Sequence, residues 1–149
     1  MKNKVTLIVA SILLSFAFAA CNTTESELDK AVKAANKDCP LDFGDGSFIE
    51  KIETNDSTVI YTISIPEEDG FTVDQLNNPF VMYLLKLGYS ETLPSFENEA
   101  IQQIVQLSHA DSMSTIMRHV GKESKMTVDI NISNEEWSAL EEISGGLQD

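Results

Sequence analysis

The chain contains two histidines, and one of them has a carboxylate close by. Asp111 follows His109 by two residues, and His119 comes later in the same region. Two imidazoles and a carboxylate are the ligand types of catalytic zinc sites, which leave a fourth position for water. One hypothesis is therefore a metal-assisted hydrolase that uses His109, Asp111 and His119. The opposing interpretation is a helix-end His109 satisfied by backbone carbonyls and a surface His119 on a strand.

Other catalytic patterns are missing from the sequence. It has no Gly-x-Ser-x-Gly motif and no glycine-rich phosphate-binding loop. Cys39 follows a helix end and has Asp38 and Asp42 nearby, so both the helix dipole and these carboxylates should raise its thiol pKa. We interpret Cys39 as a buried packing residue. The expectation is a protein that is not an enzyme and needs no cofactor or metal.

Composition excludes further classes. The 149 residues include 24 Asp and Glu against 10 Lys and Arg, a formal charge of −14. Such an acidic surface repels phosphates, so we expect no nucleic-acid partner. Apolar residues make up 42% of the chain, enough for one packed domain. Two cysteines cannot build a disulfide-rich scaffold or a four-cysteine zinc site.

The first residues have the pattern of an export signal. Lys2 and Lys4 precede an apolar run over 5–20, which is short of the roughly 20 residues that cross a bilayer. The following Phe18-Ala19-Ala20-Cys21 resembles the lipobox of bacterial lipoproteins, in which the cysteine is lipidated and becomes the N-terminus. The alternative is cleavage after Ala19, which would leave an unlipidated protein.

This resemblance implies a membrane anchor at Cys21. Loss of the leader with its two lysines leaves 24 acids against eight bases, a charge of −16. Asn22, where an aspartate would mark inner-membrane retention, points to the outer membrane. The layout of the chain is similar to that of small exported lipoproteins of Gram-negative bacteria. We expect a cleaved signal peptide over 1–20, a lipid-anchored tether over 21–24, one domain over 25–144 and a loose tail over 145–149.

Hydrophobic periodicity and capping signals predict the elements of the domain. They are a helix from the Thr24 capping box, strands over 48–53 and 58–65, a buried helix over 79–88, a helix from Ser95 to about His109, strands over 115–120 and 125–133, and a short helix from Ser133 with Trp137, Leu140 and Ile143 inward.

The element order α-ββ-αα-ββ-α predicts an α+β fold, with an antiparallel four-stranded sheet from two hairpins and helices packed on one face. Residues 25–66 and 96–133 each form a helix-plus-hairpin unit, so a tandem α-β-β repeat is one interpretation and an ordinary α+β layout is the other. The free sheet face should be polar, lined by Thr58, Thr62, Ser64, Thr127, Asp129 and Asn131.

These features favour an envelope lipoprotein whose domain is a non-enzymatic binding module. Its expected contacts are the membrane through Cys21 and an unknown envelope protein or ligand, held at the polar sheet face or an edge strand. A small periplasmic inhibitor or chaperone-like binder is an alternative, and the metal-assisted hydrolase is the rival from another class.

Overall fold

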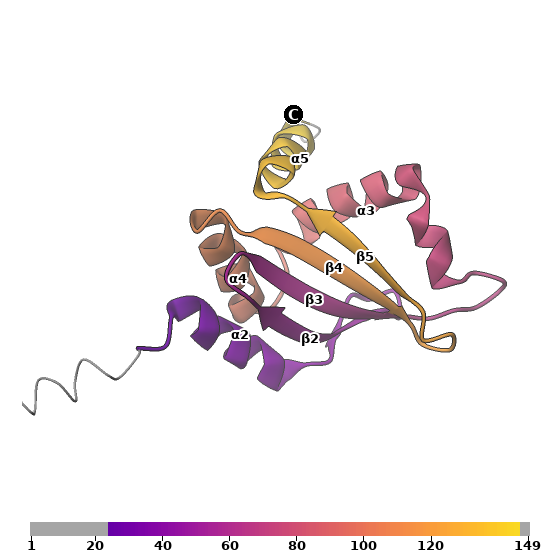
Figure 1. Ribbon diagram of the computed structural model, residues 1–149, viewed down its shortest axis with the longest axis horizontal. Coiled ribbons are helices and arrows are strands. Elements are labelled where there is room, and N and C mark those ends of the chain that lie inside the picture. The colour runs from indigo at the N-terminus through magenta and orange to yellow at the C-terminus, as the bar shows by residue number, and fades with distance from the viewer. Residues whose placement is uncertain (1–23, 147–149) are drawn as a thin grey trace, which may run out of the picture.

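The computed structural model describes residues 24–146, which fold around a single five-stranded sheet (Figure 1). In chain order the elements are α2 (Glu27–Asp38), β1 (Leu41–Asp42), β2 (Phe48–Thr54), β3 (Thr58–Ile65), the 3-10 helix η1 (Val73–Asn77), α3 (Pro79–Thr92), α4 (Glu99–Ala110), β4 (Ser114–Gly121), β5 (Thr127–Ile132) and α5 (Asn134–Gly146). The leader, Cys21 and residues 147–149 lie outside the described residues. Among those described, no helix is both long and apolar enough to cross a bilayer.

The sheet is mixed and has the strand order β1-β2-β3-β4-β5. Its two central strands, β3 and β4, pair in parallel, with Thr58 opposite Ser114 and Ile65 opposite Gly121. The other neighbouring strands pair antiparallel. The α+β class is confirmed, but the prediction of four antiparallel strands is wrong. Two parallel neighbours need a long crossover connection, and η1, α3 and α4 supply it here.

The outer edge of β2 is covered in two ways. The short strand β1, which was not predicted, pairs with Phe48 and Ile49. Beyond β1, the Asn36 side chain of α2 hydrogen-bonds the backbone of Ile52, with its Nδ2 donating to the carbonyl and its Oδ1 accepting from the N–H, both at 2.8 Å. An uncovered edge strand would recruit other chains, so this cover leaves little of β2 free for strand addition.

The helices lie over one face of the sheet, and α2 packs against α4 there. Apolar residues from both layers fill the core, and alternate residues of each long strand point into it. The predicted stripe of α2 is confirmed as buried: Leu28, Ala31, Val32 and Ala35. The cap of α2 is Ser26 instead of Thr24, because the Ser26 hydroxyl accepts the Asp29 N–H at 3.0 Å.

The two helix-plus-hairpin units are arranged differently, so the tandem-repeat interpretation is wrong. In the first unit the earlier strand, β2, lies toward the sheet edge and the later strand, β3, lies at the centre. In the second unit the earlier strand, β4, is central and β5 is at the edge. Suppose that the first strands of the two units are aligned with the helices on the same face of the sheet. Because β3 and β4 are parallel, the second strand then lies to one side of the first strand in one unit and to the other side in the other unit. The units therefore do not superpose.

The α3 helix differs most from its prediction. It starts as expected, with the Asn78 side chain accepting N–H groups of the first turn, but it continues past Gly88 to Thr92. It was predicted to be buried, yet Phe80, Tyr83 and Leu84 are 68%, 46% and 49% exposed. The α3 helix packs against η1, β5 and α5, and these elements cover only part of its apolar circumference.

Candidate binding groove

The structure does not bring the candidate metal ligands together. His109 ends α4 and lies edge-on against Trp137, with ring centroids 4.8 Å apart. Its Nδ1 is 4.0 Å from a carboxylate oxygen of Glu141. Residues 24–146 contain no group of three or more His, Cys, Asp or Glu side chains placed to hold a metal ion. The hypothetical set of His109, Asp111 and His119 is therefore not assembled.

His119 is a core residue, so its interpretation as a surface histidine is wrong. It is fully buried, and its Nε2 lies 2.6 Å from the Tyr89 hydroxyl while its Nδ1 lies 3.3 Å from the Val128 carbonyl. A carbonyl only accepts, so Nδ1 carries the proton and Nε2 accepts from the Tyr89 hydroxyl. The sequence held a signal for this position, because His119 continues the alternation of buried Thr115 and Met117.

Burial keeps both members of this pair uncharged. It lowers the pKa of His119, and burial followed by the charge of Asp45 raises the pKa of Tyr89. Burial also lowers the pKa of His109, against the opposing effect of Glu141. The Tyr89–His119 pair is thus a neutral hydrogen bond that joins α3 to β4, which is a structural role.

Cys39 is half-buried instead of fully buried. Burial raises the pKa of its thiol, and the charges of Glu50 and Asp38 act in the same direction. A nucleophilic cysteine needs a lowered thiol pKa. The environment of Cys39 therefore agrees with the expectation that its thiol is unreactive.

The predicted polar face of the sheet is more mixed than expected. Thr127, Asp129 and Asn131 are exposed on β5, whereas Thr58 is buried and hydrogen-bonded to the Ser114 hydroxyl at 3.0 Å. Half-buried apolar side chains also lie on this face: Ile60, Ile116 and Val120. The main charged residues there neutralise each other, since Arg118 donates two hydrogen bonds of 2.9 Å to the Asp129 carboxylate. This face therefore presents little unpaired charge.

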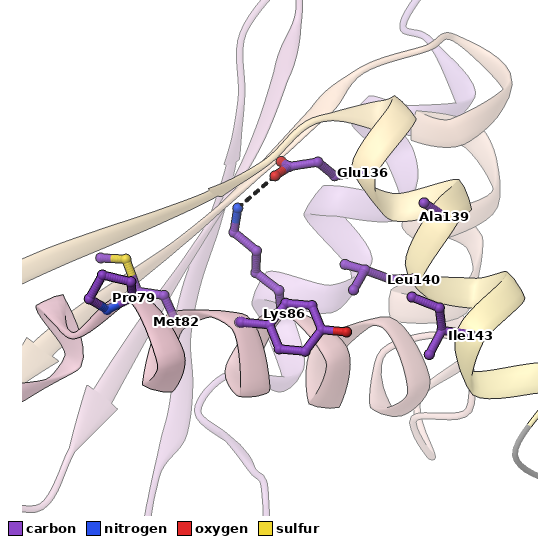
Figure 2. Close-up of a pocket in the computed structure, with 8 residues that line it drawn as sticks. Pro79, Met82, Lys86, Glu136, Ala139, Leu140 and Ile143 are labelled. Atoms are coloured by element: carbon purple, nitrogen blue, oxygen red, sulfur yellow. Dashed lines mark hydrogen bonds and ion pairs between the residues drawn. The ribbon is translucent and has the colours of Figure 1, made fainter.

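A groove of about 420 Å³ lies between α3 and α5 (Figure 2). Side chains from both helices form its walls: Pro79, Met82, Tyr83, Lys86, Glu136, Ala139, Leu140 and Ile143. Six of these eight residues are apolar or aromatic. The two charged ones are already paired, with Lys86 Nζ 2.9 Å from a carboxylate oxygen of Glu136.

Local signals position the two helices that form the groove. A reciprocal capping box starts α5: the Ser133 hydroxyl accepts the Glu136 N–H at 3.1 Å, and the Glu136 carboxylate accepts the Ser133 N–H at 3.0 Å. Buried Trp137 and Leu140 then hold α5 to the core. The predicted inward position of Ile143 is wrong, because this side chain is 44% exposed and lines the groove.

The two helices that form the groove carry mostly negative charge. The α5 helix carries Glu135, Glu136, Glu141 and Glu142 and no lysine or arginine. The α3 helix carries Lys86 and Glu91. The hydrogen bond from Ser133 and then the contact with Lys86 lower the pKa of Glu136, so this pair stays ionised near neutral pH. Beyond this pair, the remaining charged side chains of the two helices are all glutamates.

The sequence showed that α3 is apolar on nearly every side, but it did not show that part of this surface is left uncovered. On α5, the residues that line the groove lie three and four positions apart, which is the same spacing as a core-facing stripe. Sequence periodicity alone cannot separate a groove wall from a core contact.

No protein-family model matches the chain, and no curated protein sequence matches it. The fold is similar to the 1.60 Å crystal structure of a Pseudomonas aeruginosa protein described as a "putative secreted protein", with a TM-score of 0.52. The two chains are 10% identical, and the match covers 74% of this chain and 88% of the other. At this identity the likeness concerns the fold alone.

Proposed function

We propose that this chain is an exported envelope protein, anchored by lipid at Cys21, whose folded part is a non-enzymatic binding module. Its binding surface is the groove between α3 and α5. The observation that carries the proposal is the exposure of a helix as apolar as α3 beside a formed groove. A contiguous apolar patch with a polar rim is typical of an interaction site.

The dimensions of the groove suit a ligand or a segment of a partner. Its volume of about 420 Å³ falls within the range of roughly 300–1,000 Å³ found for binding pockets. Two further apolar side chains of α3, Phe80 and Leu84, are also exposed but do not line the groove. The informative feature is the groove itself, where apolar side chains of two helices gather in one place.

Export is supported by the leader pattern and by the description of the Pseudomonas protein that shares the fold. Anchoring is supported by the lipobox-like pattern alone. Five residues lie between Cys21 and the start of α2 at Glu27, a reach of about 20 Å when extended. Lipidation would therefore keep the domain close to the bilayer. In Figure 1, α2 begins at one end of the long axis and α3 begins toward the other.

Among the alternatives, an inhibitor or a chaperone-like binder would use the same groove and differ only in its partner. The polar sheet face and the β2 edge are less favourable, because Arg118 is paired with Asp129 and Asn36 covers Ile52. The metal-assisted hydrolase has no assembled ligand set in residues 24–146.

Site-specific photocrosslinking in intact cells tests the proposal. A photoreactive amino acid that replaces Tyr83, on the groove wall, should give a discrete crosslinked adduct with the partner in the membrane fraction. Met126 provides the matched control, because it is 49% exposed and apolar but lies in the β4–β5 turn away from the groove. Equal labelling from the two positions, or no adduct at Tyr83, would show that the groove is not the binding surface.

A further inference from the structure

We infer that the α3–α5 groove takes a cationic amphipathic peptide segment, which docks as a helix with its apolar face on the groove walls. This inference rests on the proposed function and adds the chemistry of the partner. Two features of the molecule carry it: the apolar walls that two helices provide, and the excess of glutamates over lysines on those helices.

The walls of the groove suit a helix. Met82 on α3 and both Leu140 and Ile143 on α5 line the groove (Figure 2). Tyr83 on α3 lines it as well. An amphipathic helix that binds in such a groove places anchors at positions i, i+3, i+4 and i+7 into apolar walls. The partner segment must therefore have a continuous apolar face.

The net negative charge of the two helices favours a partner of positive charge. The two flanking helices together carry five glutamates and one lysine, and Lys86 is held by Glu136. The whole chain has a formal charge of −14. Opposite charge attracts a partner and speeds its association, whereas like charge opposes both. A segment with Lys or Arg on its polar face is therefore favoured over an acidic segment or a second copy of this chain.

The charged groups of the groove are already paired with each other, which argues against a small charged ligand. One carboxylate oxygen of Glu136 binds Lys86 and the other accepts the Ser133 N–H. Small-molecule sites need a few polar groups that fix the orientation of the ligand. Here the recognition elements are apolar contacts and the net negative charge of the two helices, both of which suit a peptide helix.

Three synthetic peptides of about 14 residues, the length of α3, test the inference with the exported mature protein. The first is an amphipathic Leu/Lys helix, the second has Glu in place of each Lys, and the third has the composition of the first in an order without an apolar face. Fluorescence anisotropy of the labelled peptides should show binding of the first, with the other two at least about tenfold weaker. Raising the salt to about 1 M should weaken the first, because the screening length falls to about 3 Å.

Matched variants locate the site. Ile143→Ser should weaken binding of the Leu/Lys peptide about tenfold, because it removes an apolar wall. Met126→Ser removes an equally exposed apolar side chain away from the groove and should leave the affinity unchanged. Circular dichroism should show that both variants keep the native fold.

Equal affinity for the Leu/Lys and Leu/Glu peptides would overturn the inference, as would an equal loss in the two variants. If no peptide binds while Tyr83 still gives its adduct in cells, the partner chemistry is wrong and the binding module stands. If the adduct is also missing, the proposed function fails as well.

Discussion

The hydrogen bond between Tyr89 and His119 gives a sharp test of how this domain is held together. The bond is 2.6 Å long and ends on a histidine that is fully buried. Tyr89→Phe removes the hydroxyl and keeps the ring that packs against Phe43, with centroids 6.1 Å apart. The variant therefore isolates one polar interaction from the surrounding packing.

The expected cost follows from what is left behind. Nε2 of His119 loses its donor in a place that water does not reach, and a buried group without its partner costs about 1–3 kcal/mol. For a domain of this size, that corresponds to a fall in Tm of about 3–10 °C. Tyr83→Phe is the control, because Tyr83 lies on the same helix and is 46% exposed.

Urea unfolding followed by the fluorescence of Trp137 provides the assay, since this is the single tryptophan and it is buried. We expect Tyr83→Phe to stay within about 0.5 kcal/mol of the wild type. If Tyr89→Phe also stays within that limit, the buried histidine does not depend on the tyrosine hydroxyl and the reasoning is wrong.

The remaining predictions concern pH, a glycine and the anchor. Burial lowers the pKa of His119, so the unfolded chain takes up a proton as the pH falls through about 6.5 while the folded chain does not. In urea titrations, the free energy of unfolding should have its full value above that pH and should decrease below it. A urea midpoint that does not change between pH 8 and pH 5 would contradict this. Hydrogen bonds from Ser124 and Val73 lower the pKa of Glu67 to about 2, and a Cβ on Gly121 would overlap this carboxylate. Gly121→Ala should therefore lower the urea midpoint, whereas Gly88→Ala, with open space around it, should raise stability by about 0.5–1 kcal/mol; equal shifts would argue against the role of Gly121. Finally, Cys21→Ala should move the protein from the membrane pellet to the soluble fraction, and a native mature form that begins at residue 20 without fatty acid would show that the lipobox interpretation is wrong.

Local features of the sequence determined most of the elements. The Ser133–Glu136 capping box, the Asn78 cap with Pro79 after it and the apolar stripe of α2 all appear in the structure where the pattern predicted them. These signals depend on residues within about two helical turns, so neighbours in the chain are enough to specify them. The caps of α2 and α4 shifted to Ser26 and Asn98, because several capping residues stand close together there.

The parallel pairing of β3 with β4 was decided by tertiary structure. Each hairpin is a local product of its turn, whereas the direction in which the two hairpins meet depends on the path of the chain from Pro66 to Met113. That crossover also gave His119 its partner, since Tyr89 lies within it. Alternation showed which side of β4 His119 occupies, but not which residue of α3 it would contact.

The groove was also decided by tertiary structure alone. Periodicity in the sequence shows that α3 and the stripe of α5 are apolar, but exposure depends on how much of that surface other elements cover. Lys86 and Glu136, which pair across the groove, are 50 residues apart in the chain. Their helices meet because Trp137 and Leu140 are drawn into the core, and this leaves Tyr83 and Ile143 in water on either side of the groove.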